Sequence, residues 1–244
     1  GIVDADDSKS SLFLSNDDFS ELPIPARHLV DLNSYKYQID GVRATSLIAQ
    51  LGCPFKCTFC SGRNSPFLRK IRTRSVDSIM EEIEILHKSY GFEAFMFYDD
   101  ELNVSKTMVP LMNQIADYQD KNDVEFKLRG FLKSELFNEE QASAMYRAGF
   151  RWILVGFESG DEQILKNIRK NATVEDNTRC VKIAKKYGLK VKALMSIGHA
   201  GESHESIENT KKWLLEAKPD DFDCTIITTY PGSPYFDDAI RDNN

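Results

Sequence analysis

The sequence is poor in cysteine, in excess positive charge and in long apolar runs, and each shortage excludes a class of protein. Five cysteines in 244 residues, three of them clustered, do not make a secreted disulfide scaffold. A formal net charge of −7 argues against a nucleic-acid footprint and against general binding to anionic membranes. No apolar run approaches the length of a membrane span, and no signal-peptide pattern opens the chain. We therefore expect a cytoplasmic protein without a nucleic-acid partner.

With 41% hydrophobic and 28% charged residues, the chain has the composition of one sizeable globular domain. Residues 1–40 are acidic, lack a clear period and contain the run PIPAR, so we interpret them as a linker or N-terminal arm rather than core. We assign residues 41–237 to the core domain and residues 238–244 to the start of a truncated C-terminal extension. Gly1 in place of Met, and the abrupt stop at Asn244, indicate an excised portion of something longer.

From residue 42 onward, short apolar runs alternate with amphipathic stretches about six times. The clearest helical pattern covers residues 75–90, where the apolar side chains fall on one face. The expected helices have marked ends. Their N-caps are Ser75, Asn138 and Thr173, and the glycines that follow their last residues are Gly91, Gly149 and Gly188. The pattern predicts an α/β fold with a parallel sheet. Since six units are too few for a full eight-stranded barrel, we expect a partial (β/α)6 TIM-like barrel, with a doubly wound sheet as the alternative.

Nearly every expected strand runs at its C-terminal end into a polar or glycine-bearing turn. In chain order these turns contain Gly52 with the cysteines, Asp99–Glu101, Arg129–Gly130, Glu158–Gly160, Gly198–Glu202 and Tyr230–Ser233. In parallel α/β folds the chemistry gathers at this edge of the sheet, so we expect the six turns to form a single site.

Three of the cysteines, Cys53, Cys57 and Cys60, lie within eight residues and have no fourth partner nearby. Structural zinc and an ordinary electron-transfer [4Fe–4S] cluster each take four protein ligands. The histidines show no ligand spacing with these cysteines, and we expect Cys180, in a helix, and Cys224, in a strand, to pack as small hydrophobic residues. The loop therefore favours a [4Fe–4S] cluster whose fourth iron is open to a small-molecule ligand. Zinc and plain electron transfer are the alternatives.

The run GCPFKCTFC, with Phe59 just before the last cysteine, resembles the radical S-adenosylmethionine (SAM) superfamily. PIPARHLVD, FMFYDDELN, MYRAGFRWILVGFESG and TTYPGSPYF add to the resemblance, in particular to the core domain of the subgroup that often carries a cobalamin-binding domain upstream. The resemblance covers about residues 22–237. It implies a [4Fe–4S] cluster and SAM as cofactors, with the SAM amino and carboxylate groups on the open iron. One electron would then cleave SAM to methionine and a 5′-deoxyadenosyl radical, which abstracts hydrogen from a substrate.

The resemblance also implies roles for residues in the turns. Asp100 and Glu101 would accept hydrogen bonds from the SAM ammonium group, the alternative being a solvated acidic turn or a helix N-terminus. Glu158, with Ser159 beside it, would bind the ribose hydroxyls, the alternative being a helix N-cap at Ser159. Arg129 would pair with the SAM carboxylate or, equally, with Glu158.

The turn SIGHAGES, residues 196–203, resembles the glycine-bearing turn often written GLPGE in this family, with His-Ala in place of Leu-Pro. Ile197 and Gly198 would lie against the adenine ring. Three side chains on the substrate side are candidates for proton or hydrogen transfer: Tyr98, His199 and Tyr230. Aromatic packing is the alternative for the tyrosines, and a lone loop histidine is more often incidental.

Many members of the resembled subgroup are cobalamin-dependent methyltransferases, and others catalyse ring formation, rearrangement or elimination. The Asp-x-His-x-x-Gly motif typical of the cobalamin module does not occur in the sequence, so any cobalamin would be bound by a domain absent from this chain. We expect a small-molecule substrate and an electron donor such as flavodoxin or ferredoxin. A catalytically inactive, metal-stabilised binding module is the alternative from another class of protein.

Overall fold

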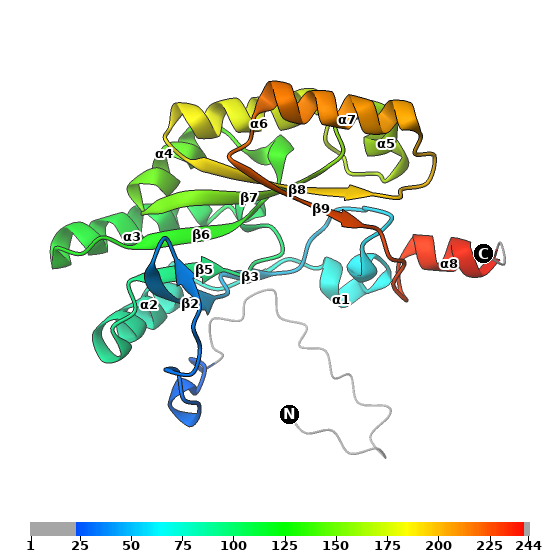
Figure 1. Cartoon of the computed structure of the whole chain (residues 1–244). Helices are drawn as coiled ribbons and strands as arrows, with labels where there is room; N and C mark the ends of the chain where they lie inside the picture. Colours follow the sequence, from blue (N-terminus) through cyan, green and yellow to red (C-terminus); the bar gives the residue numbers. More distant parts are fainter. Residues whose placement is uncertain (1–22, 242–244) are drawn as a thin grey trace, which may run out of the picture.

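A computed structural model describes residues 23–241, apart from the side chains of residues 63, 64, 66 and 67. The first 22 residues of the expected N-terminal arm and residues 242–244 of the expected C-terminal extension lie outside the described range. The described residues form a seven-stranded sheet that curls into a half-barrel, with its helices on the convex face (Figure 1).

The sheet has the strand order β1-β2-β5-β6-β7-β8-β9. Its strands are β1 (Gln38–Ile39), β2 (Val42–Leu47), β5 (Ala94–Phe97), β6 (Lys127–Leu132), β7 (Phe150–Glu158), β8 (Lys190–Ile197) and β9 (Asp221–Ile226). All neighbours from β2 to β9 are parallel, and only β1 pairs antiparallel, with β2. The predicted partial barrel of six parallel strands is confirmed. The doubly wound alternative is wrong, because the strand order never reverses.

Each crossover between parallel strands contains at least one helix. The main helices are α2 (Val76–Tyr90), α3 (Met108–Asn122), α4 (Glu139–Arg147), α5 (Glu162–Asn167), α6 (Val174–Lys186), α7 (His204–Ala217) and α8 (Pro234–Arg241). The predicted N-caps are confirmed, since the side chains of Ser75, Asn138 and Thr173 each accept a hydrogen bond from a backbone N–H in the first turn. Short elements complete the chain: the helix α1 (Pro66–Arg69), the 3-10 helices η1 (Arg27–Leu29), η2 (Ser61–Asn64), η3 (Leu102–Val104) and η4 (Ser134–Leu136), and a two-stranded sheet of β3 (Gln50–Leu51) and β4 (Arg72–Thr73).

Apolar side chains cover both faces of the sheet. The main core lies between the helices and the convex face, where Phe95 and Phe97 of β5 pack with the apolar face of α2. Because side chains alternate along a strand, Ala94 and Met96 point to the concave face and pack with Ile39 of β1. The expected boundary at residue 40 therefore divides residues that pack together, since Ile39 is buried and β1 pairs with β2.

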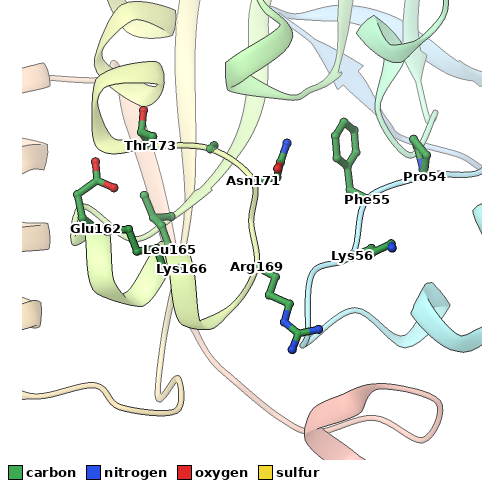
Figure 2. A pocket seen from close by; sticks show the side chains of 10 residues that line it. Pro54, Phe55, Lys56, Glu162, Leu165, Lys166, Arg169, Asn171 and Thr173 are labelled. Atoms are coloured by element: carbon green, nitrogen blue, oxygen red, sulfur yellow. The ribbon is translucent and has the colours of Figure 1, made fainter.

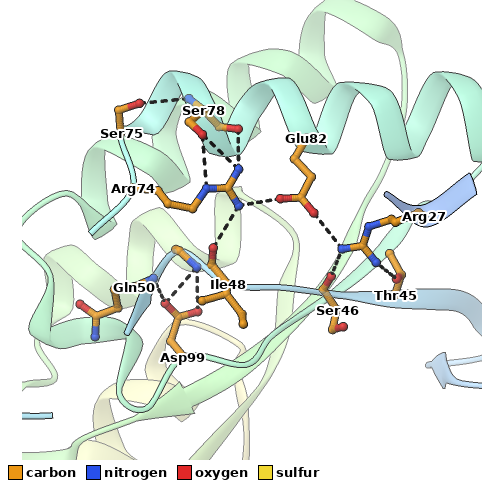
Figure 3. A network of polar contacts seen from close by, with 11 residues as sticks. Arg27, Thr45, Ser46, Ile48, Gln50, Arg74, Ser75, Ser78, Glu82 and Asp99 are labelled. Carbon is orange, nitrogen blue, oxygen red and sulfur yellow. Dashed lines mark hydrogen bonds and ion pairs between the residues drawn. The ribbon is translucent and has the colours of Figure 1, made fainter. Parts of the chain in front are cut away.

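The N-terminal arm is tied to the sheet by a buried ion-pair network (Figure 3). Arg27 donates to Glu82 Oε1 on α2 (2.8 Å) and to the carbonyl oxygen of Ser46 (2.7 Å). Arg74 donates to Glu82 Oε2 (2.5 Å) and to the carbonyl oxygen of Ile48 (3.1 Å). Glu82 is 1% exposed and thus joins the arm to the end of the strand that leads into the cysteine loop.

Candidate functional site

Two adjacent aspartates direct the chain into the cysteine loop. Asp99 is buried and accepts a hydrogen bond from the backbone N–H of Gln50 (2.5 Å), and Asp100 accepts one from the backbone N–H of Gly52 (2.7 Å). Gly52 has a φ of +93°, and a Cβ at this position would lie 2.0 Å from the carbonyl oxygen of Lys70. Only glycine fits this turn, which sets the direction in which the cysteines leave the strand.

Backbone hydrogen bonds hold the loop against other segments of the half-barrel. The N–H of Cys53 donates to the carbonyl oxygen of Leu68 (3.0 Å), and the N–H of Thr58 donates to that of Ile168 (2.9 Å), directly after α5. The N–H of Tyr235, in α8, donates to the carbonyl oxygen of Thr58 (3.3 Å). The loop is therefore fixed between segments that are far apart in the sequence.

The three clustered cysteines are free thiols, with Cys53 and Cys57 half-buried and Cys60 exposed. Burial raises the pKa of Cys53 to about 11 and also raises the pKa of Cys57, so metal binding must displace their protons. Within residues 23–241, no three His, Cys, Asp or Glu side chains converge closely enough to hold a metal ion. A four-iron cube takes each cysteine thiolate on a separate iron, and three free thiols on one loop supply three of its four corners. The donor set fits a three-ligand cluster.

Two buried lysines that the sequence pattern does not indicate lie beside the loop. Lys133 directly follows β6 and is 2% exposed; its Nζ donates to the carbonyl oxygen of Lys170 (2.7 Å) and pairs with Glu135 (2.8 Å). The same ammonium group lies 4.2 Å from the ring centroid of Phe55, which is in the cysteine loop. Lys170 is 5% exposed and donates to Glu158 Oε1 (3.1 Å). Two buried cations thus lie next to the cysteine loop.

The charges of these lysines act on the acids and thiols around them. Burial raises the pKa of Cys57, and Lys170 and Lys133 oppose that rise. Burial alone would lower the pKa of Lys170, but Glu158, Cys57 and Glu101 raise it above its ordinary value, so this lysine is charged. Burial raises the pKa of Glu101 to about 7, although the charges of both lysines act to lower it. The two lysines therefore offset part of the cost of placing negative charge on Cys57 and Glu101.

Glu158 connects the lysines to the end of β8. It closes β7 at an irregularity in the register and has a φ of +64°. Its Oε2 accepts a hydrogen bond from Ser196 Oγ (2.8 Å), which is also bonded to His199 Nε2 (2.7 Å). Burial lowers the pKa of His199, and its ring lies 5.6 Å from that of Phe59. The structure thus brings together three predicted site residues, Phe59, Glu158 and His199, from three segments.

Ser159 contributes to the scaffold around Glu158. It is buried, and its Oγ is bonded to Thr210 Oγ1 of α7 (3.0 Å) and accepts from the N–H of Asp161 (3.1 Å). Asp161, not Ser159, is the N-cap of α5, so the alternative that placed the cap at Ser159 is wrong. The cap lies two residues later because the turn after β7 is longer than the sequence pattern indicates.

Arg129 lies within β6 and not at its end, so the predicted placement is wrong. It is in register with Trp152, six residues before Glu158 on β7, which is about 20 Å along a strand. The alternative ion pair with Glu158 is also wrong, because Glu158 pairs with Lys170. The Nε of Arg129 is buried and has no hydrogen-bond partner in the described part of the chain. The cation that follows the end of β6 is Lys133.

The remaining predicted residues lie along the same edge of the sheet. Tyr98 directly follows β5 and is exposed, with its ring 6.2 Å from that of Phe131. Tyr230 is exposed and lies four residues beyond the end of β9, so it does not end the strand as expected. Ile197 ends β8, and Gly198 follows with a φ of +92° and an N–H that donates to the carboxylate of Glu202 in the same turn (2.5 Å).

The two cysteines outside the loop differ in their surroundings. Cys180 is buried in the main core, as predicted, and burial raises the pKa of its thiol. Cys224 is exposed, so the prediction that it packs as a small hydrophobic residue is wrong. It lies on β9, the last strand of the sheet. Each residue of β9 is exposed in the part of the chain that the structure describes.

A half-barrel of parallel strands with a three-cysteine loop at its carboxyl edge defines the class of α/β protein to which this chain belongs. The profile of the radical SAM superfamily matches residues 47–214, and the chain belongs to this superfamily. The predicted family is confirmed. Among residues 23–241, no helix has the length and apolar character needed to cross a membrane.

The relatives include methyltransferases and a cyclase. The chain is 33% identical to an uncharacterized methyltransferase of Pyrococcus horikoshii, over 91% of this chain and 47% of that protein. It is 24% identical to the anaerobic magnesium-protoporphyrin IX monomethyl ester cyclase of Cereibacter sphaeroides, over 88% of this chain and 35% of that protein. Its fold matches the radical SAM methyltransferase TsrM of Kitasatospora setae, solved with cobalamin and a [4Fe–4S] cluster, with a TM-score of 0.74 and 20% identity over 82% of this chain and 37% of that one. The chain spans less than half the length of these relatives.

Proposed function

We propose that the chain is the catalytic core of a radical SAM enzyme that binds a [4Fe–4S] cluster through Cys53, Cys57 and Cys60. The observation that carries this proposal is the set of three free thiols on one loop, with Cys57 close to the buried ion pair of Lys170 and Glu158. When bound, the cluster supplies one electron that breaks a sulfonium C–S bond of SAM, which gives methionine and a 5′-deoxyadenosyl radical that takes a hydrogen atom from the substrate.

The buried lysines hold negative charge at the site. Burial raises the pKa of the Cys57 thiol, and Lys170 and Lys133 lie close enough to oppose that rise, which favours the thiolate that would bind iron. Their fixed positions, one bonded to a backbone carbonyl and the other to Glu158, also make them suitable partners for the SAM carboxylate. We assign that role to these lysines ahead of Arg129, which lies deeper in the half-barrel.

Glu158 is the candidate for binding the ribose hydroxyls. Lys170 and Ser196 each donate to a different oxygen of its carboxylate, which fixes the orientation of the group. Each carboxylate oxygen has a second lone pair, so both can still accept a hydroxyl proton. His199 holds Ser196 in place and has a lowered pKa, which favours a neutral ring that contributes position rather than charge.

Other residues along the carboxyl edge complete the proposed SAM site. One carboxylate oxygen of Asp100 accepts a hydrogen bond from the N–H of Gly52. The other oxygen can accept one from the SAM ammonium group, as can the carboxylate of Glu101. We assign the backbone at Ile197 and Gly198 to the adenine; the turn that follows carries His199, whose ring lies 5.6 Å from that of Phe59. The tyrosines Tyr98 and Tyr230 are exposed and stay candidates for contact with the substrate.

We further propose that the whole protein transfers a methyl group with cobalamin bound by a segment outside this chain. The methyltransferase of Pyrococcus horikoshii and the cobalamin-bound TsrM support this reaction. Ring formation is the second candidate, and the cyclase of Cereibacter sphaeroides supports it. In both cases the core domain would perform the same cleavage of SAM.

The test of cleavage is anaerobic reconstitution with iron and sulfide, followed by reduction with dithionite in the presence of SAM. We expect 5′-deoxyadenosine and methionine to form. Cys57→Ala should abolish both the cluster and the nucleoside, whereas Cys180→Ala should retain both, because Cys180 packs in the core. An intact cluster that yields no nucleoside would support the inactive binding module.

Methyl transfer is tested with SAM labelled in its methyl group, using the full-length protein supplied with cobalamin. Label that moves from SAM to cobalamin or to product supports the methyltransferase. Formation of 5′-deoxyadenosine without any transfer of label supports ring formation or another radical reaction.

A further inference from the structure

A pocket of about 660 Å³ lies between the cysteine loop and α5 (Figure 2). One wall consists of Pro54, Phe55 and Lys56, the three residues between the first two cysteines. The opposite wall contains Lys166 of α5 and Arg169 of the connection to α6. The pocket therefore has one wall made of the loop that would bind the cluster.

The pocket concentrates positive charge on a chain whose net charge is −7. Lys56, Lys166 and Arg169 are exposed cations, and Glu162 is the acidic side chain among the lining residues. The Oε1 of Glu162 accepts a hydrogen bond from the N–H of Val174 (2.8 Å), so this carboxylate is directed toward the start of α6. Lys166 and Arg169 form no ion pair among the residues that the structure describes. This patch would attract an acidic partner.

The two walls are mechanically connected to the cysteines. Lys56 directly precedes Cys57, and consecutive Cα atoms are about 3.8 Å apart. The N–H of Thr58 donates to the carbonyl oxygen of Ile168, the residue before Arg169 (2.9 Å). A partner bound at the cations would thus lie directly against the segment that carries the thiols.

We propose that this pocket is the docking surface for a small, acidic electron-carrier protein. The inference rests on the proposed function, since the cluster needs an electron that the chain's own side chains do not supply. The reduced carrier loses one electron, the oxidised cluster gains it, and no bond forms or breaks. Pro54 and Phe55 give the surface an apolar centre, and the three cations form a charged rim, which is the usual anatomy of a transient protein interface.

The test compares two reductants on the anaerobically reconstituted chain, with cluster reduction followed by stopped-flow absorbance. One reductant is a reduced flavodoxin, and the other is dithionite, which does not need a docking surface. The double variant Lys166→Glu/Arg169→Glu should lower the flavodoxin rate about tenfold at low ionic strength and lower the dithionite rate much less, because dithionite is a small anion that needs no docking surface. The difference should disappear as salt screens the charges. Glu162→Gln should raise the flavodoxin rate.

Lys212→Glu on α7 is the matched control, because Lys212 is exposed and does not line the pocket. It should leave both rates unchanged. Equal flavodoxin rates in all variants would overturn the docking assignment, and so would an equal loss of the flavodoxin and dithionite rates, because that pattern reports damage to the cluster. Binding of inorganic phosphate that the double variant abolishes, at an unchanged flavodoxin rate, would instead identify a small-anion site. Absence of 5′-deoxyadenosine with dithionite would contradict the proposed function alone, since cluster reduction is measured without SAM.

Discussion

Replacing Glu82 by Gln removes the negative charge that Arg27 and Arg74 share at the base of the cysteine-bearing segment. The carboxylate is 1% exposed and its ion pairs measure 2.8 and 2.5 Å, so solvent screens them little. The substitution keeps the volume and one carbonyl oxygen. It leaves the guanidinium groups of Arg27 and Arg74 close together without the carboxylate charge that offsets their repulsion.

The expected loss follows from the burial of the pair. Removing one partner of a buried ion pair costs about 3–5 kcal/mol, and because the glutamine retains a carbonyl oxygen we expect this variant to lose about 3 kcal/mol of stability. For a domain of this size, about 1 kcal/mol lowers Tm by roughly 2–4 °C, so we expect Tm to fall by about 6–12 °C. That loss is a large part of a typical stability of about 5–15 kcal/mol.

The assay is denaturation by urea and by heat, followed by circular dichroism at equal cluster loading. Glu81→Gln is the matched control, because Glu81 is exposed on the same helix and should change stability by less than about 0.5 kcal/mol. A loss below about 1 kcal/mol for Glu82→Gln, or a loss equal to that of the control, would refute the assignment of Glu82 as the anchor of the arm.

Gly52→Ala should reduce the iron content after reconstitution to below about a tenth, because the new Cβ would lie 2.0 Å from a backbone carbonyl oxygen. Gly41→Ala, which has a φ of +81° but open space around it, should retain the iron. Lys170→Met should weaken SAM binding at least about tenfold by isothermal calorimetry, while Lys166→Met should not, because only Lys170 pairs with Glu158. Burial raises the pKa of Asp99 from 3.8 to about 7, so the folded state holds a proton that the unfolded state releases, and the free energy of unfolding should fall as pH rises from about 4 to about 7. Asp99→Asn should remove that part of the pH dependence, and an unchanged slope would contradict it.

The features that local patterns determine could be predicted from the sequence. Six strand–helix units and the N-caps at Ser75, Asn138 and Thr173 follow from residue spacing and capping chemistry. The cysteine loop was predictable for the same reason, since its ligands lie within eight residues. The parallel order of the strands then brings the turns to one edge.

The buried lysines could not be found this way. A lysine in a polar turn is ordinarily exposed, and only the packing of the α5–α6 connection on the cysteine loop buries Lys170. Arg169 and Asn171 on either side of it have positive φ values, a backbone path that sequence periodicity does not indicate. Arg129 was misplaced because strand ends are the least certain part of a periodic pattern, and Lys133 is the first residue beyond the end of β6.

The central claim is that three cysteines hold a four-iron cluster whose fourth iron binds SAM. Mössbauer spectroscopy of the chain reconstituted with isotopically labelled iron tests it most directly. We predict four irons per chain, of which one responds to added SAM while the other three do not. A mononuclear centre, or a cluster in which SAM alters no iron, would contradict the claim.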